Sequence, residues 1–493
     1  MEYLIRLVQV HESFRKAELE ALATLAGLSP LEFVFYEENT PFCIIKLASS
    51  DEARALIRRS ILSAGIYELW GQGSTYEELH ADVKARTASK WAAYKQTSFR
   101  FSVDAFQGKR SPSQQRELIN SFRYMELEGI IDLKSPSLHL CIHEDWELGA
   151  AAPRRLFLGR WLADGDRRAI ITYDLKKRRY ISTTSMDAEL ALVTANMALA
   201  APGRLFFDPF VGTGSFSVAA AHFGATAMGS DIDGRSIRGK GKDRCVRANF
   251  VQYGTTGRLL DNFISDLTNT PLRIGAARWL DGIVCDPPYG VREGLKVLGR
   301  KDGGGKEAVI IDGQLAHLFV SHLHPHSHSQ FPLPNPTNPP TTTRRDGYVP
   351  PKRPYSFDVM LDDILDFAVR TLVDGGRLSM WMPTANDDDI DLPIPAHPAL
   401  RLVSVCVQPF NKWSRRLLTY ERRADGDVDP GVRWEKRVDG GAGAAADELN
   451  AFRRKYFQGF KTPEELAQEA AAAAASVESL GNGSSTAQQP QQK

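Results

Sequence analysis

The chain has 493 residues, which is enough for two or three domains that each bury a core. Its formal net charge of +1 excludes a protein coated with basic surface, so any contact with nucleic acid must be local. Five widely spaced cysteines argue against a disulfide framework and favour thiols in a reducing compartment. No signal peptide and no long apolar run are present, so we expect a cytoplasmic protein without a membrane span.

The first predicted region covers residues 1–70. Its apolar spacing predicts strands at 3–10, 33–36 and 42–47 and helices at 13–26 and 51–64. This β-α-β-β-α order is typical of a ferredoxin-like α/β unit.

A second predicted region, residues 71–152, continues as a mixture of helices at 76–85 and 111–125 and strands at 98–105 and 138–143. Four basic side chains form a modest positive face here: Lys109, Arg110, Arg116 and Arg123. That face fits contact with RNA and an ordinary solvated helix surface equally well.

Basic residues are densest in the predicted linker, residues 153–185. Between 154 and 179, nine Lys or Arg side chains stand against three acids, and Trp161 and Tyr173 lie among them. Basic charge with interleaved aromatic rings suits a phosphate backbone and splayed bases. A charged hinge between domains is the alternative.

A glycine-containing loop follows a predicted apolar strand at 205–207 and precedes a helix that begins at Ser215. A phosphate-binding P-loop needs a lysine after its last glycine, and Ser215 stands there. A dinucleotide fingerprint needs a third glycine, and Ser217 occupies that position. We therefore predict a ligand that lacks phosphates and carries positive charge near Asp208, which fits S-adenosyl-L-methionine. The loop residues predicted to bind it are Asp208, Pro209, Phe210, Gly212, Thr213 and Gly214.

The predicted donor site draws on three more stretches. A helix predicted at 182–201 would place Thr183 and Ser185 at its start, where a helix N-terminus attracts the donor's carboxylate. Asp231, followed by Ile232, ends a second strand and can accept ribose hydroxyls; Asp233 is the alternative acid. Asp266, followed by Leu267, ends a third strand and can accept the adenine amino group.

The predicted catalytic turn is Asp286-Pro287-Pro288-Tyr289, which ends the buried strand 280–285. The Asp286 carboxylate and the Pro287 carbonyl can each accept one N–H of an exocyclic amine, and Tyr289 can stack on its ring. An aryl amine is a poor nucleophile because its lone pair is delocalised, and two such acceptors would free that lone pair. A buried turn in which the acid caps a neighbouring group is the alternative.

The ordered motifs at 208–215, 229–233 and 286–290 resemble those of class I methyltransferases that modify amino groups. With the stretches 180–191, 291–294 and 353–357, the resemblance narrows to the eukaryotic tRNA guanine-10 N2-methyltransferase catalytic subunits. The close part of the resemblance spans about residues 150–420.

This resemblance implies a Rossmann-like, doubly wound and mostly parallel sheet in a methyltransferase domain at 186–425, with a THUMP-like module at 71–152. It also implies S-adenosyl-L-methionine as donor, tRNA as substrate, and a heterodimer with a small zinc-binding activator subunit. An open sheet edge would suit that partner, and the stretch expected to contact it is strand 225–230 with the helix after it.

The remaining C-terminal stretches are less regular. An insert at about 314–352 holds five clustered histidines and a Pro-rich run. Clustered histidines can bind zinc, but no Cys or acid lies among these five, so we expect a disordered insertion. A helix at 357–373, a strand at 375–383 and a hairpin of 402–408 with 417–421 follow, with Arg415 and Arg416 on its loop. Residues 426–493 are expected to hold a helix and a disordered tail.

Two other functions remain open from the residues. The Asp-Pro-Pro-Tyr turn also serves transfer to the N6 of adenine, so a DNA adenine methyltransferase is one alternative. A catalytically silent RNA-binding scaffold is the other, and it predicts no binding of the methyl donor.

Overall fold

The protein is described by a computed structural model, which covers residues 1–275, 277–291, 294–298, 307–311, 314–318, 352–385, 393–410, 413–437, 450 and 453. The chain forms two compact units. The first unit comprises Met1–Ser265, Leu272–Pro287 and Leu365–Trp434, and the second comprises Asp266–Pro271, Pro288–Ile364 and Glu435–Lys493.

The N-terminal part of the first unit is a seven-stranded sheet in the order β2-β3-β1-β4-β7-β6-β5. Its strands are β1 (Glu2–Leu7), β2 (Glu32–Tyr36), β3 (Phe42–Lys46), β4 (Ser63–Gly73), β5 (Phe99–Phe106), β6 (Leu138–Asp145) and β7 (Arg155–Asp164). Its helices are α1 (Glu12–Ala26), α2 (Ser50–Ile57), α3 (Tyr76–Tyr94) and α4 (Pro112–Ser121). The predicted β-α-β-β-α order is present from β1 to α2, but regions 1–70 and 71–152 share this one sheet.

The predicted linker differs from the structure in its first part, because Arg155–Asp164 is the strand β7, paired with both β4 and β6. Two of the basic side chains that suggested a linker form ion pairs with glutamates of the N-terminal part. The guanidinium of Arg155 lies 3.0 Å from the carboxylate of Glu37, and Arg160 lies 2.6 Å from Glu68. Leu156 and Leu158 are buried between them in sequence.

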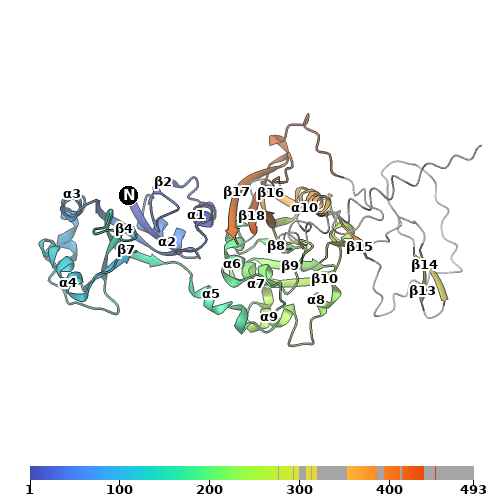
Figure 1. Cartoon of the computed structure of the whole chain (residues 1–493), viewed down its shortest axis with the longest axis horizontal. Helices are drawn as coiled ribbons and strands as arrows, with labels where there is room; N and C mark the ends of the chain where they lie inside the picture. Colours follow the sequence, from blue (N-terminus) through green and yellow to red (C-terminus); the bar gives the residue numbers. More distant parts are fainter. Residues whose placement is uncertain are drawn as a thin grey trace, which may run out of the picture. The chain divides into compact units, whose positions relative to one another are not determined.

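The second sheet of the first unit has the order β10-β9-β8-β11-β16-β18-β17 (Figure 1). Its strands are β8 (Leu205–Asp208), β9 (Thr226–Asp231), β10 (Leu259–Ile264), β11 (Leu280–Cys285), β16 (Leu372–Ala385), β17 (Leu400–Pro409) and β18 (Trp413–Arg422). The first five in that order run parallel. β18 is antiparallel to both of its neighbours, β16 and β17, so β17 runs in the same direction as the first five. This is the predicted doubly wound, mostly parallel methyltransferase fold.

Helices cover both faces of this sheet. Successive residues of a strand point to opposite sides, so a strand with consecutive apolar residues needs a partner on each face. Phe206 belongs to a buried core with Leu190 and Phe216, on the helices α6 and α7. Phe207, the next residue, stacks against Phe367 of α10 on the other face, with ring centroids 5.5 Å apart. The helices of this region are α5 (Arg168–Thr172), α6 (Ala188–Met197), α7 (Ser215–His222), α8 (Gly234–Arg238), α9 (Val246–Gln252) and α10 (Phe357–Thr371). The 3-10 turns are η1 (Arg123–Met125), η2 (Leu175–Lys177), η3 (Thr256–Arg258), η4 (Leu267–Asn269) and η5 (Asp425–Asp427).

Two predicted elements have different boundaries in the structure. The helix expected at 182–201 is α6, which begins only at Ala188 because the side chain of Asp187 caps it by accepting from the amide of Leu190. Arg415 and Arg416 lie within β18 instead of on a hairpin loop, opposite Gln408 and Val407 of β17.

The two sheets of the first unit are tied together through α1. The buried carboxylate of Glu18 accepts hydrogen bonds from the amides of Ile61 and Leu62 and from the side chain of Asn196 on α6, at 3.0, 2.9 and 2.7 Å. Burial raises the pKa of Glu18. Ser13 also exchanges hydrogen bonds with the backbone of Val407 in β17. These polar contacts fix one arrangement of α1 against α6 and β17.

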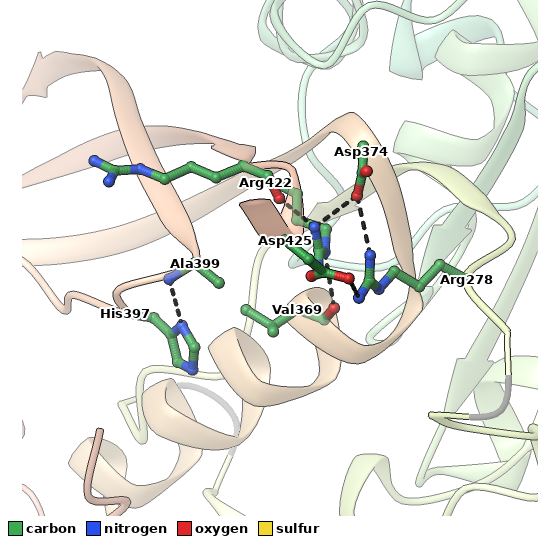
Figure 2. A network of polar contacts seen from close by, with 8 residues as sticks. Arg278, Val369, Asp374, His397, Ala399, Arg422 and Asp425 are labelled. Carbon is green, nitrogen blue, oxygen red and sulfur yellow. Dashed lines mark hydrogen bonds and ion pairs between the residues drawn. The ribbon is translucent and has the colours of Figure 1, made fainter. Parts of the chain in front are cut away.

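An arginine network joins the loops at the opposite end of the second sheet from the predicted catalytic turn (Figure 2). Asp374 accepts from both Arg278 and Arg422, at 3.0 and 2.7 Å. Asp425 likewise accepts from both guanidiniums. Because each carboxylate is shared by two arginines, the segments before β11, after α10 and after β18 are held at fixed positions.

The second unit contains two small antiparallel strand pairs. β12 (Lys296–Leu298) pairs with β15 (Lys352–Pro354), and β13 (Glu307–Ile311) pairs with β14 (Gln314–Leu318). β14 therefore takes up the first residues of the predicted insert. Residues 319–351 and the predicted C-terminal tail from 454 onward lie outside the described residues, so their predicted disorder stays a prediction.

None of the helices in the described part of the chain combines the length and apolar character needed to span a membrane. All five cysteines are free thiols, and four of them are buried. In the same part of the chain, no group of three or more His, Cys, Asp or Glu side chains is arranged to hold a metal ion.

Candidate active site

Three acids meet at the carboxyl ends of three adjacent parallel strands. Asp231 ends β9, Asp208 ends β8, and Asp286 follows β11. Asp208 is only 2% exposed, and burial raises its pKa, reinforced by the nearby charges of Asp231 and Asp286. Such a cluster favours a positively charged ligand, and it lies beside the point where the strand order reverses, where open α/β sheets bind ligands.

The glycine loop after β8 is held in shape by a hydrogen bond within the loop and by the conformation of its glycines. The carboxylate of Asp208 accepts from the amide of Phe210 at 2.9 Å. Gly212 and Gly214 both have positive φ, +50° and +82°. A Cβ on Gly214 would lie 2.7 Å from Cγ1 of Val246, whereas one on Gly212 would meet only a carbonyl oxygen at 3.9 Å. Gly214 is therefore required by packing, and the side of Gly212 is open to a ligand.

The acid on the second strand supports the same loop. One carboxylate oxygen of Asp231 accepts from the amide of Gly212 at 2.9 Å, and the other accepts from the amide of Asp233 at 2.7 Å. Asp233, the alternative acid, caps α8 and pairs with Arg235 at 2.8 Å. Ile232 between them is half-buried. Of the two acids, Asp231 is the one placed at the loop.

Thr183 and Ser185, both predicted to bind the donor's carboxylate, have different surroundings in the structure. The hydroxyl of Ser185 lies 2.7 Å from the hydroxyl of Thr213 in the glycine loop. Thr183 is exposed, and both residues precede α6, whose N-terminus is already capped by Asp187. A role based on the N-terminus of α6 therefore has no support, whereas Ser185 remains a residue of the loop region.

Three supporting residues were not predicted from the sequence. Asn249 donates to the carbonyls of Thr213 and Tyr180, at 3.2 and 2.9 Å. Arg178, buried within the basic run, donates to the hydroxyl of Ser215 at 2.9 Å. The density of basic residues around 154–179 predicted Arg178 as part of a surface that contacts RNA, whereas the structure shows it buried.

Arg415 is the third. Its guanidinium lies 3.7 Å from the carboxylate of Asp286 and 3.9 Å from that of Asp187. It also stacks 4.5 Å over the ring of Trp381, and its Nε donates to Gln408 at 2.6 Å. Arg415, which was predicted to lie on a hairpin loop, is thus a cation held in a fixed position beside Asp286, the predicted catalytic acid.

In the first unit, Pro287 is buried directly after Asp286. The second unit contains Pro288 and Tyr289, both half-buried, and the backbone carbonyl of Tyr289 accepts from the side chain of Asn450 at 2.8 Å. The next carbonyl, of Gly290, accepts from Arg453. Two residues from the C-terminal part of the chain therefore hold the end of the predicted catalytic turn.

Asp266 and Leu267 also belong to the second unit, and both are buried. The carboxylate of Asp266 accepts from the amide of Thr268, the side chain of Asn269 and the amide of Leu298, each at 3.0 Å. Asp266 thereby joins η4 to β12. These contacts leave the predicted role toward adenine a prediction.

The residues at the strand ends fit the predicted donor. The three clustered carboxylates suit a ligand with ammonium and sulfonium charges. Residues 208–214 contain no Lys or Arg, which a phosphate-binding loop would use. The open side of Gly212 allows close approach of a ligand to the backbone.

Comparison with known proteins gives matches along most of the chain. The family profile "Tmrp11 THUMP N-terminal domain" matches residues 1–167, and "RMKL-like, methyltransferase domain" matches residues 176–300. The tRNA (guanine(10)-N(2))-methyltransferase of Saccharomyces cerevisiae is 42% identical, over 93% of this chain and 99% of that protein. That of Schizosaccharomyces pombe is 40% identical, over 85% and 89%. The human tRNA (guanine(10)-N(2))-methyltransferase TRMT11 is 33% identical, over 93% and 95%.

Proposed function

Because the chain belongs to the tRNA (guanine(10)-N(2))-methyltransferase family, we propose that it transfers a methyl group from S-adenosyl-L-methionine to the exocyclic N2 of guanine 10 in tRNA. The single observation that carries this proposal is the placement of Asp286 after β11, beside Asp208 and Asp231 at the ends of the neighbouring strands. Donor-binding and acceptor-binding carboxylates thereby share one edge of the sheet.

The donor is held by the loop 208–214 and the acids around it. The buried carboxylate of Asp208 lies where positive charge is favoured, and Asp231 offers acceptors for ribose hydroxyls while it supports Gly212. Asp266 is proposed as the acceptor for the adenine amino group, with Ile232 and Leu267 as apolar neighbours of the ring. When bound, S-adenosyl-L-methionine supplies the methyl group from a sulfonium sulfur.

The acceptor amine is prepared by the turn that follows β11. The carboxylate of Asp286 and the carbonyl of Pro287 each accept one N–H of the amine, which draws the nitrogen toward tetrahedral geometry and frees its lone pair. Tyr289 stacks on the base, which must leave its helix stack to be reached. The nitrogen forms the new bond to the methyl carbon as the carbon–sulfur bond breaks, and the carboxylate of Asp286 accepts the proton that the nitrogen then loses. Most of the rate enhancement comes from positioning and from fixed charges.

The alternatives have less support. Transfer to adenine N6 would use the same turn, but the relatives that span nearly the whole chain are named for guanine in tRNA. A silent scaffold would need no clustered acids beside an open glycine loop.

The test uses the full chain co-expressed with the expected zinc-binding activator, labelled donor and three substrates: transcribed tRNA with guanine at position 10, the same tRNA with adenine there, and duplex DNA. Mass spectrometry of the nucleosides is expected to find N2-methylguanosine in the first substrate only. Methyladenosine in the second or third substrate would replace guanine as the target, and absence of product together with absence of donor binding would support the scaffold.

We further propose a heterodimer with a small zinc-binding activator protein. β10 is an edge strand of the second sheet, next to β9, and Leu260 and Ile264 on it are 60% and 51% exposed. An edge with exposed apolar residues is an aggregation hazard unless another chain pairs with it. The chain expressed alone should therefore be poorly soluble or inactive, and co-expression with the activator should rescue it. A soluble and fully active single chain would overturn this. A location in the cytoplasm is likewise proposed.

A further inference from the structure

The loop that joins α8 to α9, residues 239–245, lies in a strongly basic stretch of the first unit (Figure 1). Between 238 and 247 the chain has five Lys or Arg residues and a single acid, Asp243. All five basic side chains are exposed: Arg238, Lys240, Lys242, Arg244 and Arg247. None of the five forms an ion pair within the described part of the chain. Their positive charge is therefore available to a ligand.

The loop has a defined shape because main-chain atoms hydrogen-bond across it. The amide of Lys240 donates to the carbonyl of Arg244 at 2.7 Å, and the amide of Arg244 donates to the carbonyl of Gly241 at 3.1 Å. The thiol of Cys245 donates to the carbonyl of Lys242 at 3.4 Å. These contacts do not involve the ammonium and guanidinium groups, so the loop presents its charges to the outside from a fixed backbone.

The helix α9 places this stretch beside the glycine loop of the candidate active site. Val246 is the first residue of α9, and its Cγ1 is the atom that a Cβ on Gly214 would approach to 2.7 Å. Asn249 of the same helix donates to the carbonyl of Thr213 at 3.2 Å. Because Arg247 directly follows Val246, the basic stretch reaches the carboxyl edge of the second sheet, where the donor-binding residues lie.

The end of the basic run at 154–179 is held against the same helix. Gln252, the last residue of α9, accepts from the amide of Arg179 at 2.9 Å and donates to the carbonyl of Lys177 at 2.7 Å. Arg179 is exposed, and its guanidinium forms no ion pair within the described residues. The fold therefore adds a charge from a distant part of the sequence to the surface around α9.

These side chains together form a basic surface, which comprises Arg179, Arg238, Lys240, Lys242, Arg244 and Arg247. Like charges on one surface repel one another, and a polyanion relieves this repulsion while it releases counterions. The charges are spread over two segments, which suits an extended polyanion better than a single small anion. The stretch 238–247 contains no aromatic residue on which a base could stack. The surface therefore fits the phosphates of a nucleic acid instead of its bases.

We propose that this basic surface binds the phosphate backbone of the RNA substrate beside the glycine loop. The inference rests on the proposed function for the identity of the polyanion. Phosphate contacts fix the position of a nucleic acid without reading its sequence, so the surface holds the RNA at the edge of the sheet where methyl transfer takes place. It supplies a local grip that a net charge of +1 does not provide over the whole protein.

The test is the salt dependence of tRNA binding by the full chain co-expressed with the activator, measured by fluorescence anisotropy with labelled tRNA. The double variant Lys240→Gln/Lys242→Gln should bind tRNA at least roughly tenfold more weakly, with a slope of log K against log salt that is shallower by about 2. Donor affinity, measured by calorimetry, and the amount of co-purified activator should be unchanged. The matched control is Lys46→Gln/Lys95→Gln, which removes two lysines that are each paired with a glutamate and should change neither slope nor affinity.

A double variant that binds tRNA with the slope and affinity of the wild type would overturn the proposal. Weaker donor binding, or loss of the activator, with unchanged tRNA binding would assign the surface to that ligand and overturn the proposal equally. If the double variant fails to fold, the single variants Lys242→Gln and Arg247→Gln carry the same test, each with a slope shallower by about 1. Wild-type slopes in both would count against the proposal.

The measurement needs no turnover, so it separates this inference from the proposed function. A wild-type protein that binds tRNA but methylates nothing sinks the proposed function and leaves the basic surface to be judged by its own slope. A wild-type protein that binds no tRNA overturns both.

Discussion

The guanidinium of Arg415 lies 3.7 Å from the carboxylate of Asp286, the acid that follows β11. Arg415 is held on its other sides by the ring of Trp381 and by Gln408, and it also faces Asp187. The carboxylate of Asp286, which is proposed to accept a hydrogen bond from the substrate amine, is therefore paired with a cation whose position is set by the hairpin of β17 and β18. This pairing orients Asp286 before the substrate arrives, which is the arrangement that electrostatic catalysis requires.

Asp286→Ala should reduce single-turnover methylation by at least about 100-fold, because a positioned polar partner of the transition state is lost. Donor affinity, measured by calorimetry, should stay near the wild-type value. The matched control is Asp187→Ala, which removes the other carboxylate near Arg415 together with the cap of α6. It should cost about 1 kcal/mol of stability and leave methylation largely intact. Near-normal turnover in Asp286→Ala would remove this acid from the mechanism.

Asp231→Ala should weaken donor binding by a few kcal/mol at most, because it removes an acceptor of ribose hydroxyls and the support of the Gly212 amide. Asp233→Ala serves as the control, since Asp233 is already engaged with Arg235 and the start of α8. Titration calorimetry with the donor distinguishes the two variants. Equal affinities in both would contradict the assignment of Asp231.

The two glycines of the loop should respond differently to alanine. Gly214→Ala places a Cβ 2.7 Å from Val246 and also forces alanine into a positive φ. The left-handed backbone alone costs about 1–2 kcal/mol, so Gly214→Ala should lower the free energy of unfolding by more than that amount. Gly212→Ala meets open space and should cost about that smaller amount, while weakening donor binding. Denaturant unfolding together with calorimetry measures both effects. A Gly212→Ala variant that is as destabilised as Gly214→Ala would contradict the packing argument.

Asn450→Ala should lower turnover without changing donor affinity, because the side-chain amide of Asn450 holds the carbonyl of Tyr289. Asn450→Asp is the sharper variant. It keeps the volume but cannot donate the hydrogen bond, so it should lower turnover to a similar degree. Wild-type kinetics in Asn450→Asp would show that Asn450 only fills space.

Stability should fall as the pH rises above neutrality because of a buried histidine in the N-terminal sheet. Burial opposes charging of His143, but Cys141 on its own strand and the Asp104 carboxylate on β5 outweigh burial and raise its pKa to about 9. Arg6 on β1 shares Asp104, and the ring of Tyr67 on β4 packs against His143. Because the folded pKa exceeds the ordinary 6.5, the stabilisation is fully present below pH 6.5 and is lost as the pH rises through 9.

The measurement for this last prediction is the free energy of unfolding between pH 6 and 9.5, roughly the window in which the group titrates, in the wild type and in His143→Gln. The wild type should lose up to a few kcal/mol across it, and the variant should lose less. Parallel curves for the two proteins would exclude His143 as the cause.

The sequence by itself determined the residues whose role depends on local order along the chain. Asp208, Asp231 and Asp286 each follow a short apolar run, and parallel strands end at one edge of a sheet, so their meeting could be predicted from spacing alone. The loop glycines were predictable for the same reason, since a strand-to-helix turn needs positive φ at fixed positions.

Only the tertiary structure decided which distant residues support them. Arg415 reaches Asp286 because β18 pairs with β16 in one register, and a shift by one residue would turn its side chain to the other face. Asn450 reaches Tyr289 across 161 residues. The run at 155–164 is a strand because it pairs with both β4 and β6, and Glu37 and Glu68, far away in sequence, form ion pairs with two of its arginines. The sequence shows that such residues are present, but it does not show which residues they contact. The partner of each is determined by the path of the chain and the pairing of the strands, and both depend on the packing of the whole fold.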